Sequence, residues 1–254
     1  MGDPNHHENH DAPTQGSGTT LAIISVVDHN LPYDDYNLYD VVFHTHTIHT
    51  LLTTSPSHVD TWLSDTLNHH STTTTTTVLV GLDIEWRPNT HRNSDNPVAT
   101  LQLCVGNRCL VFQILHSPSV PQSLVDFLVN EGHTFLGVGI EEDVEKLLED
   151  YNLNVKNFVD LRGLAESVLG ESEMKRAGLK RLAERVLGLE IEKPKRISRS
   201  RFNTLALMLS CRSKLGECCM VLEMETKRLL IFGICFFLVL IGCTGNGCGQ
   251  RPAG

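Results

Sequence analysis

The chain has 254 residues, 41% hydrophobic and 20% charged, which gives room for one α/β domain with appendages. Its net charge of −9 argues against broad binding to nucleic acid. The sequence shows no N-terminal signal peptide, and Cys104 and Cys109 are the only cysteines before residue 202. These features predict a reduced protein of the nucleus or the cytoplasm.

The segments before residue 78 carry none of the candidate site residues. Residues 1–18 contain three His, two Pro and three Gly with almost no large apolar side chain, which predicts a disordered segment. Its histidines could bind metal weakly, but a solvated tail is the favoured interpretation. The histidines at 44, 46 and 49 alternate with other residues, as on an exposed strand face. A helix is predicted near residues 57–67, followed by a threonine-rich connection at 72–77.

Residues 78–86 (VLVGLDIEW) alternate as a strand does, and this pattern places Asp83 and Glu85 on one face. Same-face positions lie roughly 6.5 to 7 Å apart along a strand. That spacing suits two oxygen ligands of a pair of divalent ions about 3.5 to 4 Å apart, as in nucleases and polymerases. Mg²⁺ or Mn²⁺ fits such ligands. The alternative is a solvated acidic face on an edge strand.

Residues 98–114 predict a hairpin: a strand at 99–105, a turn at Gly106 and Asn107, and a strand at 109–114. A helix is expected near 122–129 and a buried strand at 134–138. Two further helices are expected at 161–169 and 179–187. Strands first, with helices interleaved afterwards, indicate a mixed sheet flanked by helices.

Asp143 lies on a further predicted helix, which starts near Ile140. The apolar stripe of this helix consists of residues 140, 144, 147, 148 and 151, while the acids at 141, 145 and 149 form a separate row. Asp143 precedes Leu147 by one turn and therefore faces inward with the stripe. Because an inward carboxylate without a partner is costly, we predict that Asp143 is a third metal ligand.

At these residues the chain resembles the DEDD superfamily of 3′-5′ exonucleases, in particular the Werner syndrome-like exonuclease domains of plants. Residues 83–85 (DIE) match the first motif of the family, and residues 137–147 (GVGIEEDVEKL) match the second with Asp143 as its acid. Further matching segments run from residue 39 to residue 201. The resemblance implies a ribonuclease H-like α/β fold and an exonuclease-like domain at 19–201, with Asp83, Glu85 and Asp143 as catalytic metal ligands.

The third family motif, a Tyr or His followed by a final metal-binding Asp, has no counterpart here. The last Asp, Tyr and His of the chain are Asp160, Tyr151 and His133. The resemblance therefore implies an enzyme of impaired activity. The alternative is a non-catalytic nucleic-acid-binding isoform.

Residues 202–254 form a divergent tail that holds six of the eight cysteines, without the spacing or the histidines of a zinc site. Residues 229–242 are an uncharged apolar run of fourteen, shorter than the roughly 18 to 20 residues of a transmembrane helix. A membrane anchor is one interpretation. The favoured one is that the tail reads like translation through an intron, in a shifted frame or through an alternative last exon.

A basic strip at residues 193–201 carries five Lys or Arg and no acid. Lys193, Lys195, Arg196 and Arg199 are the predicted contacts to the phosphates of a DNA or RNA 3′ end. A solvated loop or a nuclear-localisation-like patch is the alternative.

Overall fold

A sheet of eight strands forms the centre of the structure, a computed structural model that describes residues 20–21, 24–43, 46–70, 77–87 and 95–190. Its strands are β2 (Ile24–Asp28), β3 (Tyr36–Phe43), β4 (His46–Thr53), β5 (Val78–Trp86), β6 (Val98–Val105), β7 (Arg108–Phe112), β8 (His133–Gly137) and β9 (Phe158–Asp160). A separate pair joins β1 (Thr20–Leu21) and β10 (Leu189–Glu190).

The spatial order of the sheet is β2-β3-β4-β7-β6-β5-β8-β9. The pairs β4–β7, β5–β8 and β8–β9 are parallel, and the other neighbouring pairs are antiparallel. The prediction of a mixed sheet flanked by helices, in the α/β class, is confirmed. The strand that carries Asp83, β5, pairs with β6 on one side and with β8 on the other, so it lies inside the sheet.

The helices are α1 (Pro56–His70), α2 (Gln122–Leu128), α3 (Ile140–Tyr151), α4 (Leu161–Leu169) and α5 (Leu179–Leu187), with short 3₁₀ turns η1 (Ile114–His116) and η2 (Ser172–Arg176). The predicted bounds of α4 and α5 agree with the structure. None of the helices in the described ranges is long and apolar enough to cross a membrane. The apolar run at 229–242 and the segment at 1–18 lie outside the described residues.

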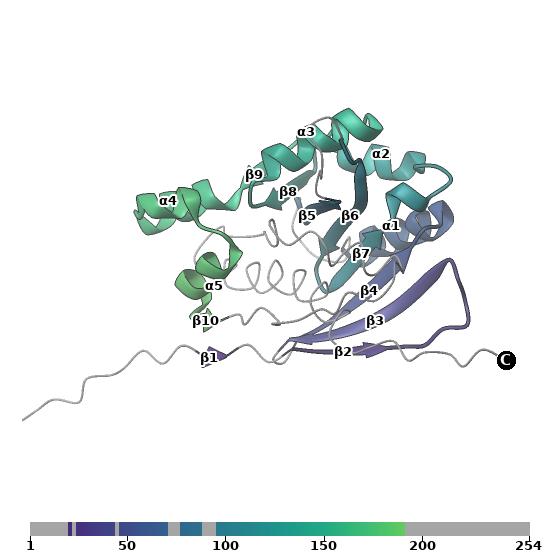
Figure 1. Cartoon of the computed structure of the whole chain (residues 1–254), viewed down its shortest axis with the longest axis horizontal. Helices are drawn as coiled ribbons and strands as arrows, with labels where there is room; N and C mark the ends of the chain where they lie inside the picture. The colour runs from purple at the N-terminus through teal and green to yellow at the C-terminus, as the bar shows by residue number, and fades with distance from the viewer. Residues whose placement is uncertain (1–19, 22–23, 44–45, 71–76, 88–94, 191–254) are drawn as a thin grey trace, which may run out of the picture.

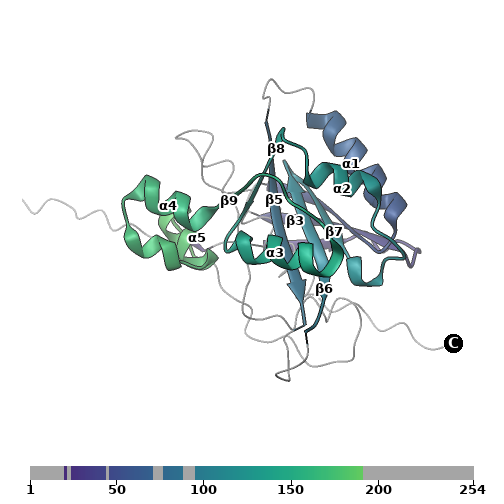
Figure 2. The same cartoon turned by 90° about the horizontal axis from the view of Figure 1, so that it is seen from above.

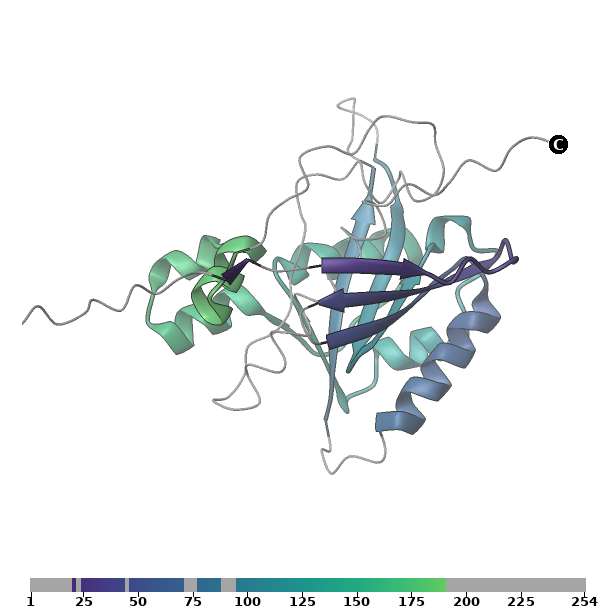
Figure 3. The same cartoon turned by 90° about the horizontal axis from the view of Figure 1, so that it is seen from below.

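Helices α1, α2 and α3 lie over one face of the sheet (Figure 2). Each contributes buried apolar side chains to one core, among them Trp62, Phe127 and Leu147, which pack with Leu82 and Ile84 of β5. Burial of these side chains stabilises the fold by about 1.5 to 3 kcal/mol per large residue. Figure 3 turns the molecule to show β2, β3 and β4 from the other side.

Helices α4 and α5 project at one end of the molecule, beyond β9 (Figure 1). In this region Ala165 of α4, Met174 of η2 and Ala183 of α5 are fully buried. This end follows the strand β9 directly, because Asp160 ends the strand and caps α4.

The β6–β7 hairpin turns at Gly106 and Asn107, as predicted, with Gly106 at φ 63°. Cys104 and Cys109 face each other across it, with Cα atoms 4.3 Å apart, and are joined by a disulfide. Directly opposite positions of an antiparallel pair bring the two Cα atoms close enough for a bond, which the spacing in sequence alone did not reveal.

Candidate active site

Asp83 and Glu85 lie on one face of β5, and only 6% and 2% of their respective surfaces are exposed. The alternating residues Leu82 and Ile84 point to the other face, into the apolar core beneath the helices. Since β5 is hydrogen-bonded to β6 on one side and β8 on the other, it is not an edge strand. The alternative of a solvated acidic face is excluded.

The neighbouring strand places polar side chains opposite both acids. Gln102 of β6 pairs with Asp83, and Thr100 pairs with Glu85. Side chains that lie directly opposite in an antiparallel pair share a face, with Cβ atoms about 4.5 to 5.5 Å apart. We call these four residues the polar strip. It is buried throughout, since Thr100 is 2% exposed and Gln102 is 0% exposed.

Asp143 lies in the first turn of α3 and is 6% exposed. The inward orientation predicted for it is confirmed, as is the exposure of the acidic row at 141, 145 and 149. Leu148 was expected in the apolar stripe but is 47% exposed. It lies at the border of the stripe, where Leu147 takes the buried position.

Two glycines set the entry into α3. A Cβ on Gly137 would lie 2.9 Å from Cβ of Ile140 and 3.0 Å from the carbonyl oxygen of Leu82, so the strand end approaches β5 too closely for a side chain. Gly139 is the N-cap of α3 at φ 77°, a left-handed conformation that favours glycine. These two constraints explain why glycine occupies both positions of the second motif. They also fix where α3 begins, and so where Asp143 lies in its first turn.

Contacts at both ends hold α3 in place. The backbone N–H of Gly139 donates to Oδ2 of Asp160 at 2.9 Å. At the far end, Tyr151 donates from its hydroxyl to the carbonyl of Val98 at 2.7 Å, and Asp150 accepts from the N–H of Val98 at 2.8 Å. The helix that carries Asp143 is thereby tied to β9 and to the start of β6.

Burial raises the pKa of Asp143 to about 7; the nearby Arg162 acts to lower it and Asp160 to raise it. Burial also acts to raise the pKa of Asp160, but hydrogen bonds from Arg162 and from Gly139 outweigh this effect and the pKa is lowered. The Arg162 side chain reaches Asp160 at 2.5 Å. Sequence reasoning missed this pair, because only the fold brings residues 160 and 162 beside Asp143.

The chemistry of the acids fits a hard divalent cation. Mg²⁺ usually binds through one or two carboxylates, several waters and substrate phosphates, without an all-protein cage. Asp83 and Glu85 meet that requirement as a pair on one strand face. Within the ranges that the structure describes, no three His, Cys, Asp or Glu side chains form a group that could hold a metal ion by themselves. Asp143 is therefore a predicted additional ligand that this structure does not join to the pair.

Other predicted residues fall elsewhere. The basic strip, with Lys193, Lys195, Arg196 and Arg199, lies outside the described residues. His49 is exposed on β4, and its Nδ1 lies 2.7 Å from Asp40. Asp40 also lies 3.1 Å from His29. These are polar contacts between side chains at the surface of the β2–β4 part of the sheet.

A family model and two relatives of known class agree on one class of enzyme. A family model described as 3′-5′ exonuclease matches residues 54–214. A 3′-5′ exonuclease of Arabidopsis thaliana is 41% identical over 120 residues, which cover 46% of this chain and 41% of that protein. The bifunctional 3′-5′ exonuclease/ATP-dependent helicase WRN of Mus musculus is 35% identical over 130 residues, 51% of this chain and 9% of that protein. The chain thus spans at most about two fifths of these relatives.

Among solved structures, the EXD2 exonuclease domain soaked in Mg and GMP aligns with a TM-score of 0.42 and 23% identity, covering 64% of this chain and 81% of that one. The family match reaches residue 214, thirteen residues beyond Arg201, the last residue of the matching segments in the sequence. Residues 202–214 nevertheless contain no Asp, Tyr or His.

Proposed function

Because this chain belongs to the 3′-5′ exonuclease family, we propose that it binds the 3′ ends of nucleic acids at the polar strip and hydrolyses their terminal phosphodiester bonds slowly. The observation that carries the proposal is the buried pair of Asp83 and Glu85 on one face of a central strand, at the position of the first family motif. Two buried carboxylates on one strand face offer the hard oxygen ligands that Mg²⁺ and Mn²⁺ prefer.

Asp83 and Glu85 would hold Mg²⁺ or Mn²⁺, and Asp143 would approach from the first turn of α3. A divalent ion in such a site stabilises the charge on phosphoryl oxygens and lowers the pKa of bound water. The chain itself orients the carboxylates through the β5 ladder and shields them from bulk water. Phosphates of the substrate would meet the basic strip at Lys193, Lys195, Arg196 and Arg199.

A second candidate is a non-catalytic binder of nucleic acid, and the sequence after Arg201 favours it. That segment has no Asp, Tyr or His to supply the last ligand and the residue that orients the attacking water. Such a chain would keep the affinity for 3′ ends and lose most of the rate. Anchoring to a membrane through residues 229–242 would be an addition to this second candidate.

The test is a nuclease assay on the full chain with a 5′-labelled single strand and Mn²⁺. We expect slow shortening from the 3′ end, which Asp83→Asn removes and Glu145→Gln does not. The control acid Glu145 is exposed on α3. Binding of the strand without any shortening supports the second candidate, and neither binding nor shortening contradicts both.

A further inference from the structure

The amide of Gln102 is the most unusual polar group in the described part of the sheet. Gln102 is 0% exposed, and neither its Nε2 nor its Oε1 has a hydrogen-bond partner. Buried amides in folded proteins nearly always have partners, because an unmet donor or acceptor has lost its hydrogen bonds to water. An apolar residue of the same length would avoid that cost.

The position of Gln102 within β6 suggests what the amide is for. All eight residues of β6 are buried, and the strand is otherwise mostly apolar. Its cross-strand neighbours are Val111 on β7 and Asp83 on β5. Val111 offers no polar side-chain atom, so the acid is the polar side chain directly opposite. The other polar residue of β6 with an unmet side-chain oxygen, Thr100, is opposite Glu85 in the same way.

We propose that Gln102 is a positioning residue for the metal site: its Nε2–H donates to the carboxylate of Asp83 when that carboxylate holds a divalent cation. The proposal rests on the metal-binding role given to Asp83 above. A carboxylate offers about four acceptor positions, so it can accept from an amide while it ligates a cation. A hydrogen bond to an ionised acceptor is also roughly twice as strong as a neutral one.

If this proposal holds, Gln102 strengthens metal binding but destabilises the fold when no metal is bound. Ligands of metals are held by a second set of hydrogen-bonding residues, whose removal typically lowers metal affinity by about 10- to 100-fold. In the absence of the cation, the same amide is an unmet polar group and destabilises the fold. Gln102→Met removes donor and acceptor and keeps the length of the side chain. It should therefore weaken metal binding and raise the melting temperature measured with a chelator.

Thr50 provides a matched control. It is 1% exposed on β4, its Oγ1 has no hydrogen-bond partner, and it lies in the row of Cys109 and Cys104, on the same sheet face as Gln102. It is two strands from β6 and three from the acids of β5. Thr50→Val should leave the affinity for Mn²⁺ unchanged.

The experiment measures, on the full chain, Mn²⁺ binding by calorimetry and the melting temperature with a chelator. We expect Gln102→Met to bind Mn²⁺ about 10- to 100-fold more weakly than the wild type and to melt at a higher temperature. Unchanged Mn²⁺ affinity overturns the positioning role and leaves the proposed function standing. A lower melting temperature, or failure to fold, also overturns it, because the amide would then have a structural partner. Absence of Mn²⁺ binding by the wild type contradicts the proposed function itself, and the positioning role with it.

Discussion

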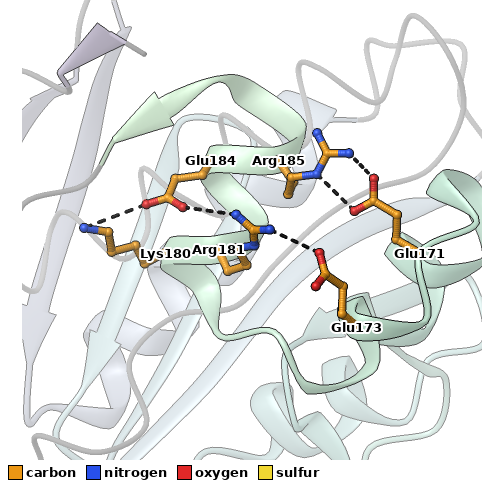
Figure 4. A network of polar contacts seen from close by, with 6 residues as sticks. All are labelled: Glu171, Glu173, Lys180, Arg181, Glu184 and Arg185. Carbon is orange, nitrogen blue, oxygen red and sulfur yellow. Dashed lines mark hydrogen bonds and ion pairs between the residues drawn. The ribbon is translucent and has the colours of Figure 1, made fainter. Parts of the chain in front are cut away.

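The polar strip of β5 and β6 and the surface of α5 differ in the burial of their polar side chains: those of the polar strip are buried, and those around α5 are exposed or half-buried. Around α5, Arg181 pairs with Glu173 at 3.1 Å and with Glu184 at 3.8 Å. Figure 4 shows these contacts together with those of Arg185 to Glu171 and of Lys180 to Glu184; we call the six residues the α5 network. Its side chains are exposed or half-buried.

The polar strip differs from the α5 network in burial and in the hydrogen bonding of Gln102. Its side chains are almost wholly buried, and the amide of Gln102 has no partner. Surface ion pairs each contribute little to stability, whereas a buried unmet polar group reduces it. The comparison teaches that the charges around α5 are paired on the surface at little energetic consequence, whereas the unmet amide of Gln102 carries a cost that its proposed role beside Asp83 would offset.

The largest expected effect concerns the tail. If the residues after Arg201 are replaced by a family-like segment that supplies Tyr and Asp, shortening of a labelled strand should speed up by roughly a hundred- to a thousandfold. Single electrostatic or positioning contacts in active sites are commonly worth this much. Equal rates for both chains would show that a tail carboxylate such as Glu217, Glu223 or Glu225 already replaces the missing Asp.

The second effect concerns pH. The pKa of Asp143 is raised to about 7, and a protonated carboxyl is a poor metal ligand. Mn²⁺ affinity should therefore fall as pH drops below about 7, by up to about tenfold per pH unit for one proton, and level off above it. Calorimetry between about pH 6 and about pH 8 measures this slope. Asp143→Asn should flatten it, and an unchanged slope would remove Asp143 from the site.

The raised pKa of Asp143 also contributes to the pH dependence of the stability of the metal-free chain. Because its pKa in the folded state lies above the ordinary 3.8, Asp143 binds a proton more tightly in the folded than in the unfolded chain. The melting temperature with a chelator should therefore fall as pH rises from about 4 to about 7. Asp143→Asn should lose this part of the pH dependence.

A smaller effect is expected from the basic strip. Changing Lys195, Arg196 and Arg199 together to Ala should weaken binding of a single strand and reduce the slope of log affinity against log salt. Each phosphate contact on a single strand contributes about 0.7 to that slope, so three contacts contribute about 2. An unchanged slope would place the strip outside the nucleic-acid interface.

The smallest effect belongs to the α5 network. Arg185→Gln should leave both the melting temperature and Mn²⁺ affinity close to those of the wild type, because this pair with Glu171 is exposed and screened by solvent. A large loss of Mn²⁺ affinity in this variant would link the surface of α5 to the polar strip and break the contrast between the two regions.

Periodicity was enough to predict the faces of β5 and α3. It placed Asp83 and Glu85 on one side of the strand and Asp143 on the inward side of its helix, and the burial of all three agrees. Turn residues predicted the β6–β7 hairpin. Strands β2 and β3 were missed, since half-exposed strands at the end of a sheet carry a weak apolar pattern.

The partners of the acids could not be predicted, because periodicity assigns a residue to a face without naming its neighbour across the sheet. The register of β5 with β6 puts Gln102 opposite Asp83, and that register exists only in the folded sheet. A glutamine within the apolar run at residues 98–105 was the one signal available. The contact of Asp160 with the start of α3 likewise joins residues that are far apart in the sequence.

The most direct test of the central claim is calorimetric titration of the full chain with Mn²⁺, comparing the wild type with Asp83→Asn and with the exposed control Glu145→Gln. The account predicts binding by the wild type and by the control, and none by Asp83→Asn, whose side chain keeps its shape but loses its charge. Equal binding by all three chains would show that the ion is held elsewhere and that the buried carboxylates of β5 are not the metal site.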